Sequence, residues 1–221
     1  MNLQEAEAVI QLAYGDYQPI RDAYRSTIYT AVLEYLGSTG PVTSYRNQAR
    51  RAVQETFYAA AEQGLKDGGG DPPLRGEDLQ WMNMRTEAER ANIDKMFQQL
   101  RELRNDPEPL TSDEKFLAAS TRAENYTASL DSIYNEAKVR GAGAMMLTFD
   151  GQDGHAPEFP CPECKKLKGQ RHRASWWVSR GLVPYPGNSN FTCGTWQCRH
   201  FLYNDKGEVM TLPSIIQAGV K

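Results

Sequence analysis

The four cysteines of this chain are the residues whose type and spacing point most clearly to chemistry. Two residues lie between Cys161 and Cys164, four lie between Cys193 and Cys198, and 28 lie between the two pairs. Zinc prefers four soft or borderline ligands in a tetrahedron, and the first spacing lets both thiolates of one turn reach a single ion. Because the cysteines cluster in a chain without an evident secretory signal, zinc ligation is favoured over disulfide bonds.

The ligand set stays open, because His200 can take the place of one cysteine. The favoured set is Cys161, Cys164, Cys193 and Cys198, whereas in the other set His200 replaces Cys193 or Cys198. Side chains two residues apart on a strand point to the same side, so Cys198 and His200 can both face a metal. Four thiolates leave no open coordination position, so we expect a structural zinc rather than a catalytic one. The small, loop-rich segment around the cysteines needs such a source of stability.

A second interpretation is a zinc-stabilised protein that binds nucleic acid. Basic side chains neutralise phosphates, and aromatic rings stack on bases. The candidate residues lie together between the cysteine pairs: Lys165, Lys166, Lys168, Arg171, Arg173 and Arg180, with Trp176 and Trp177. The favoured alternative is that the tryptophans are core residues around the zinc and the charges are solvated.

A zinc-containing nuclease of the His-Asn-His type is less favoured. The catalytic histidines of such enzymes normally lie between the two cysteine pairs, where this chain has only His172. No spacing brings two of the nearby carboxylates together as an acid and base pair. The chain also lacks a phosphate loop, a dinucleotide fingerprint and a serine elbow. We therefore expect no catalytic residue and a protein that is not an enzyme.

The first two thirds of the chain supply long helices. Apolar residues recur there at three- and four-residue steps, which places them on single helix faces. Glycine and proline separate the helices at 37–41, 67–73 and 105–109, and Thr111 with Glu114 forms a capping box that opens the last one. The predicted core faces are Ile20, Tyr24, Ile28, Ala31, Val32 and Tyr35; Ala49, Val53, Phe57, Ala60 and Ala61; Leu79, Met82, Ala88, Ala91, Met96, Leu100 and Leu103; Phe116, Ala119, Ala123, Leu130, Ile133 and Ala137.

The composition and charge change near residue 145. Residues 1–150 carry 16 basic and 23 acidic side chains, whereas residues 151–221 carry 9 basic and 5 acidic ones. Glycine, proline and aromatic residues dominate the second part, which predicts short strands and loops. The fold class expected is mainly α, with a helical bundle or hairpin over 1–145 and a small zinc-stapled α+β module over 146–221. No run approaches the roughly 18 apolar residues of a membrane span, so we expect none.

Residues 148–203 resemble the C-terminal module of tailed-phage minor head proteins, the head-morphogenesis proteins of the Mu F-like group. The shared features follow one another in the order Thr148-Phe149-Asp150-Gly151, a nearby Asp153, Cys161-Pro162-Glu163-Cys164, Leu167-Lys168-Gly169 and Cys198-Arg199-His200. In that group a helical N-terminal region precedes the module. The long helices of this chain are compatible with that arrangement.

The resemblance implies a structural component of a phage virion that assists head assembly or DNA delivery. Such proteins associate with the portal, the neck or the inner capsid surface, and they are made in the host cytoplasm. The implied partners are other virion proteins (portal, capsid or neck components), with contact to packaged DNA also open. Long helices and an aromatic-rich module offer large surfaces, so we expect an oligomer within the particle.

Overall fold

The computed structural model describes residues 15–151, 162–185, 188–191 and 200–211. The chain divides into two compact units, each built from separate stretches of sequence. The bundle unit comprises Pro19–Ala59 and Arg75–Leu130. The sheet unit comprises Met1–Gln18, Ala60–Leu74 and Asp131–Lys221. None of the helices in the described residues combines the length and apolarity that crossing a membrane requires.

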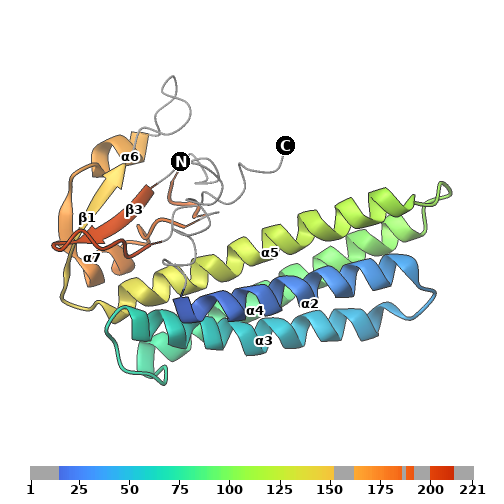
Figure 1. Ribbon diagram of the computed structural model, residues 1–221, viewed down its shortest axis with the longest axis horizontal. Coiled ribbons are helices and arrows are strands. Elements are labelled where there is room, and N and C mark those ends of the chain that lie inside the picture. The colour runs from blue at the N-terminus through green and yellow to red at the C-terminus, as the bar shows by residue number, and fades with distance from the viewer. Residues whose placement is uncertain (1–14, 152–161, 186–187, 192–199, 212–221) are drawn as a thin grey trace. The chain divides into compact units, whose positions relative to one another are not determined.

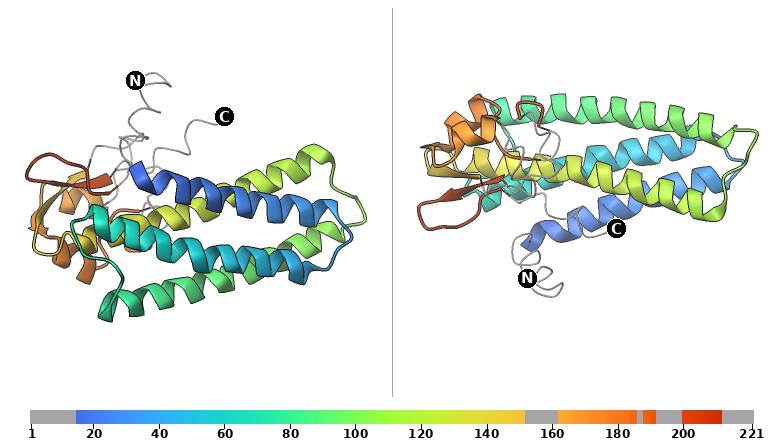
Figure 2. Two further views of the ribbon diagram at one scale, coloured as in Figure 1. Left: turned by 60° about the horizontal axis from the view of Figure 1, so that its bottom comes forward. Right: turned by 90° about the horizontal axis from the view of Figure 1, so that it is seen from above.

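Four long helices supply the bundle unit. They are α2 (Gln18–Gly37), α3 (Val42–Asp67), α4 (Gly76–Arg104) and α5 (Ser112–Gly141). Within this unit successive helices run side by side in alternating directions (Figure 1, Figure 2). Aromatic pairs join α2 to each of the other three, with ring centroids 5.8 Å apart for Tyr24–Phe57, 5.6 Å for Tyr35–Phe97 and 5.8 Å for Tyr29–Phe116. The unit is therefore a four-helix bundle with an aromatic core.

The predicted core faces of α2 and α3 are confirmed almost completely. Five of the six residues predicted on α2 are fully buried, namely Tyr24, Ile28, Ala31, Val32 and Tyr35. Ile20, near the start of the helix, is half-buried. All five residues predicted on α3 are buried. Periodicity located these faces because large apolar residues mark them without interruption.

The predicted faces of α4 and α5 are partly wrong. On α4, Met82, Met96 and Leu100 are buried as predicted, whereas Leu79, Ala88, Ala91 and Leu103 are exposed. The core face of α4 instead includes Trp81, Thr86, Glu89, Ile93 and Phe97. Burying an aromatic ring or an isoleucine removes far more apolar area from water than burying an alanine, so those residues set the orientation of the helix. On α5, Phe116 is 58% exposed, and its ring meets that of Tyr29 in an edge-to-face arrangement.

The sheet unit contains a three-stranded antiparallel sheet with strand order β2-β1-β3. Its elements follow along the chain as β1 (Met146–Gly151), α6 (Pro162–Leu167), β2 (Arg171–Arg173), α7 (Ala174–Ser179) and β3 (His200–Asn204). Thr148, at the middle of β1, pairs with Arg171 on one side and with Tyr203 on the other. Side chains that pair directly point to the same face, so Leu147, Phe149 and Leu202 share the face that is buried.

One hydrophobic cluster fills the core of this unit. Trp177 of α7 is fully buried, and its indole N–H donates to the carbonyl of Leu147 at 3.2 Å. Phe149 stacks on Trp177 on one side and on Phe191 on the other, with centroids 5.9 and 6.1 Å apart. Cys164 belongs to the same cluster. Side chains of β1 therefore hold α6, α7 and the loop that contains Phe191 together in one core.

The C-terminal ends of α3 and α5 also belong to the sheet unit and pack unusually closely. A Cβ atom added at Gly64, Gly68 or Gly141 would lie 2.5 Å or less from a backbone carbonyl oxygen of the other helix, well inside the van der Waals contact distance. Tyr17, in a short 3-10 helix, η1 (Gly15–Tyr17), stacks on Tyr134 of α5 with centroids 4.1 Å apart. Small residues at four-residue spacing thus allow backbone-to-backbone contact.

The expected fold class is confirmed at the level of architecture, since the chain is mainly helical with a small antiparallel sheet. The change from long helices to short elements falls between Gly141 and Met146, as the composition predicted. The predicted division into a helical region, 1–145, and a zinc-binding module, 146–221, stays a prediction.

Candidate metal centre

Of the first cysteine pair, the structure describes Cys164, which lies on helix α6. Cys164 is 6% exposed and lies in the core cluster with Leu167, three residues further along the same helix. The three-residue spacing places both side chains on one helix face, which packs against β1. The thiol is thus held beside the central strand of the sheet.

A tight turn after α6 fixes this helix to β1. The amide of Gly169 donates to the carbonyl of Phe149 at 2.9 Å, and the amide of Phe149 donates to the carbonyl of Gln170 at 3.0 Å. Gly169 has a φ of 74°, a left-handed conformation that favours glycine. The Leu-x-Gly part of the motif therefore has a structural reason, because leucine fills the core and glycine makes the return to the sheet.

The structure does not describe the side chains of the remaining predicted ligands. Cys161, Cys193 and Cys198 lie outside the described residues, and of His200 only the backbone is described, at the start of β3 opposite Gly151 of β1. The described residues nearest these cysteines in the sequence are Pro162, Phe191 and His200. All three belong to the sheet unit, and Phe191 reaches the same core as Cys164.

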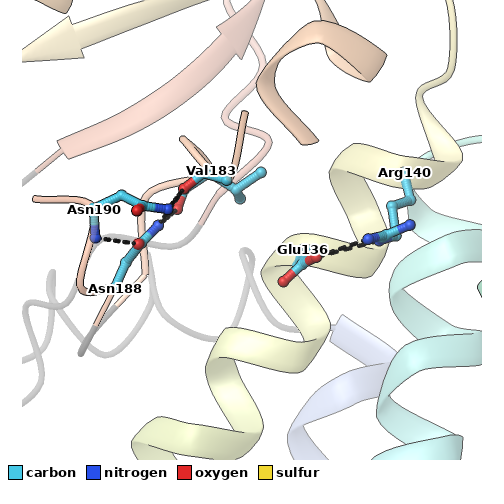
Figure 3. A network of polar contacts seen from close by, with 6 residues as sticks. Glu136, Arg140, Val183, Asn188 and Asn190 are labelled. Atoms are coloured by element: carbon cyan, nitrogen blue, oxygen red, sulfur yellow. Dashed lines mark hydrogen bonds and ion pairs between the residues drawn. The ribbon is translucent and has the colours of Figure 1, made fainter. Parts of the chain in front are cut away.

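Two asparagines, which sequence reasoning missed, fix the loop that leads to Phe191. The buried side-chain amide of Asn188 donates to the carbonyls of Gly181 and Val183 at 2.9 and 2.8 Å. Its side-chain oxygen accepts from the amide of Asn190 at 3.0 Å (Figure 3). The Asn-x-Asn run after Pro-Gly could have predicted this loop. Asparagine is common in turns because its side chain hydrogen-bonds nearby backbone groups.

Helix α5 carries a second polar contact in the same unit. Arg140 pairs with Glu136, one turn earlier, with 2.9 Å between the guanidinium nitrogen and the carboxylate oxygen (Figure 3). Both side chains are largely buried, at 17% and 12% exposed. This pairing neutralises both charges along the helix.

The described residues alone do not form a metal site. Within them, no three histidine, cysteine, aspartate or glutamate side chains come together as ligands. Three of the four cysteines lie outside those residues, so zinc and its ligand set stay predictions. No known protein family, curated protein or solved structure matches this chain.

The two tryptophans of the alternative interpretation differ in their exposure. Trp177 is fully buried, as the core interpretation predicts, and offers no ring face to a nucleic acid. Trp176 is half-buried and packs on the same core. Its ring stacks on His172 with centroids 3.7 Å apart, and the guanidinium of Arg180 lies 4.7 Å from the ring centre. The Trp176 ring is therefore already engaged within the protein.

The basic side chains of the alternative interpretation are on the surface. Lys165, Lys166, Lys168, Arg171 and Arg173 are all exposed. Arg171 is paired with Asp205, the closest nitrogen-to-oxygen distance being 2.6 Å. This hydrogen bond lowers the pKa of the Asp205 carboxyl. The carboxylate of Asp205 therefore offsets the positive charge of Arg171, one of these five basic residues.

Proposed function

We propose that this protein is a non-enzymatic structural component of a tailed-phage virion, a minor head protein associated with the portal, the neck or the inner capsid surface. It would assist head assembly or DNA delivery, with a structural zinc holding the sheet unit. The observation that carries the proposal is the meeting of the motif residues: Phe149, Cys164 and Leu167 share one core although the first and the last are 18 positions apart in the sequence.

Those features of the resemblance that the structure describes lie on or beside one strand. The Thr-Phe-Asp-Gly run is part of β1, Pro162, Glu163 and Cys164 belong to α6, and Gly169 closes the turn back to β1. His200 pairs with the last residue of β1. The contact of these described parts with a single strand supports the proposal that the motif forms one structural module.

The size of this module supports a structural role for the metal. Its strands have six, three and five residues, and its two helices have six residues each. Elements this short contribute little stability by themselves, and small modules of this kind often depend on a metal. Bound zinc would join α6 to the segments that flank β3, whereas a catalytic zinc would need an open coordination position.

The test is the presence of the protein in phage particles. Particles are purified from cells that produce the phage encoding this chain, and the protein is quantified by mass spectrometry relative to the major capsid protein. We expect a few copies per particle for the wild type and for Lys165→Gln, an exposed position on α6, and strong loss for Cys164→Ser. Wild-type protein that is abundant in the lysate but missing from intact particles contradicts the proposal.

Nucleic-acid binding is the second candidate, favoured by the exposed Lys165, Lys166 and Arg173, for which the described residues show no ion pair. A gel-shift assay with a salt titration tests it. If these residues neutralise phosphates, their combined replacement by glutamine lowers the salt slope by about 3, whereas Lys95→Gln on α4 leaves the slope unchanged. Absence of any shift at low salt removes this candidate.

A further inference from the structure

A carboxyl group is buried in the core of the bundle unit. Glu89 is 6% exposed and lies on the core face of α4, three residues after the buried Thr86 and four before the buried Ile93. Glutamate is almost never buried this completely without a paired charge, because removing an ionised carboxylate from water is costly. Its position therefore requires an explanation beyond packing.

Polar groups from three helix segments surround this carboxyl. On α4, Asn92 donates its side-chain amide to Glu89 at 3.0 Å, and Arg85, one turn earlier, acts on the carboxyl through its charge. Ser129 of α5 also hydrogen-bonds Glu89. The tyrosines close enough to interact with its charge are Tyr24 of α2 and Tyr126 of α5, and Arg122 of α5 interacts with Tyr126.

The basic residues that α3 directs towards α4 are engaged elsewhere. Arg46 and Arg50 lie 3.8 and 3.6 Å from the carboxylate of Asp94, five residues beyond Glu89. Tyr24 is fully buried, and among the described residues its hydroxyl has no hydrogen-bond partner. The hydrogen bonds that the described residues give Glu89 thus come from the neutral side chains of Asn92 and Ser129, and the charge of Arg85 acts on it from one turn earlier.

Burial is the dominant influence on the protonation of this carboxyl. Desolvation raises the pKa of Glu89, and its hydrogen bonds to Asn92 and Ser129 and the charge of Arg85 offset the rise only in part. Burial and the charge of Glu89 likewise raise the pKa of Tyr24. The folded bundle therefore holds a proton on Glu89 at pH values where the unfolded chain has released it.

We propose that Glu89 makes the bundle unit sensitive to pH. The helices stay packed together while the Glu89 carboxyl carries a proton, and the turn of α4 around Glu89 opens to solvent when the carboxyl ionises. The sign follows from linkage. A group that binds its proton more tightly in the folded state adds stability below its unfolded pKa, and this stability is lost as the pH rises through the folded pKa. The proposal is independent of the proposed virion function.

The experiment compares the full-length wild type with Glu89→Gln and with Glu102→Gln, a control at an exposed position on the same helix. Glutamine keeps the shape and the hydrogen-bonding oxygen of Glu89 but carries no charge. Hydrogen exchange is followed by mass spectrometry on peptides covering residues 82–96 between pH 5 and pH 8, after correction for intrinsic exchange rates. Thermal unfolding is recorded over the same range.

We expect protection of residues 82–96 to fall at least tenfold from pH 5 to pH 8 in the wild type and in Glu102→Gln, and to stay constant in Glu89→Gln. The melting temperature should follow the same pattern by several degrees. A parallel loss of protection in all three proteins overturns the proposal. If Glu89→Gln does not fold, carbon NMR of the wild-type glutamate carboxyls decides instead: titration of Glu89 at the ordinary glutamate pKa overturns the proposal, and a raised value supports it.

Discussion

The backbone of Gly169 is hydrogen-bonded to the backbone of Phe149, with 2.9 Å between the glycine nitrogen and the phenylalanine oxygen. This bond joins the turn after α6 to the central strand. Gly169 makes it with a left-handed φ of 74°, and a Cβ at this position would meet no neighbouring atom. Glycine is therefore favoured here because of its left-handed backbone conformation, and not because a side chain would clash with a neighbour.

Gly169→Ala should weaken zinc retention if the metal lies where we propose. Alanine disfavours the left-handed conformation by about 1–2 kcal/mol, so the turn that positions α6 should relax and Cys164 should be held less firmly. We expect zinc to be lost to a competing chelator at least several-fold faster. Gly207→Ala is the matched control, because Gly207 has a similar φ of 80° and equally open surroundings but lies outside the cysteine motif. Equal losses from both variants would contradict this assignment.

Removing the metal should affect the two units differently. The purified protein should contain about one zinc ion per chain, and a strong chelator should expose the amides of residues 146–179 to hydrogen exchange. The helical circular-dichroism signal of the bundle should remain, because its aromatic core contains none of the predicted ligands. Cys164→Ser should reproduce the effect of the chelator. Loss of the entire helical signal would instead show that both units unfold as one.

The capping box at the start of α5 should be sensitive to acid. Thr111 and Glu114 exchange side-chain-to-backbone hydrogen bonds, of 2.8 Å to the carboxylate and 3.3 Å to the hydroxyl. The Thr111 amide and the Thr111 hydroxyl both donate to the Glu114 carboxylate and lower the pKa of Glu114, so the stability from these two bonds is present at neutral pH and is lost as the pH falls through the folded-state pKa. Thr111→Ala should destabilise the protein by about 1 kcal/mol near pH 7 and by less in acid. Urea unfolding at both pH values, with Ser112→Ala as the control, measures the difference.

The sequence was sufficient to predict most of the helical architecture, and α4 shows where that prediction ends. Breaks at glycine and proline located the helices, and large apolar residues located the core faces of α2 and α3. On α4 the alanines at 88 and 91 fit the periodicity yet are exposed, while Glu89 is buried. Alanine is small enough for either face, and the burial of Glu89 depends partly on a hydrogen bond from Ser129 of α5, which no local pattern reveals.

The candidate site was predictable only in its local parts. The Cys-x-x-Cys spacing predicted a turn, and the structure places Cys164 on the short helix α6, where it shares a buried face with Leu167. The hydrogen bonds of Asn188 could not be predicted, because its acceptors are backbone carbonyls placed by the fold. The ligand set itself lies mostly outside the described residues and stays a prediction.

Gly141→Ala should destabilise the sheet unit strongly. A Cβ at Gly141 would overlap the carbonyl group of Leu65, and a helix backbone cannot move aside as a flexible side chain can. We expect a loss of about 2–3 kcal/mol, measured by urea unfolding. Gly37→Ala is the control, since a Cβ there meets nothing within 4 Å and alanine favours helices. If both substitutions are neutral, the close approach of α3 and α5 is not as tight as the structure has it.

Tyr24→Phe isolates the contribution of the buried hydroxyl beside Glu89. Among the described residues this hydroxyl has no hydrogen-bond partner, so the folded state bears its desolvation without compensation. Removing the oxygen should leave the aromatic contact with Phe57 intact and stabilise the bundle by about 1 kcal/mol at any pH. Urea unfolding at pH 5 and pH 8 measures this gain, with Tyr29→Phe as the control. A loss of stability instead of a gain would show that the hydroxyl serves Glu89 as a hydrogen-bond donor.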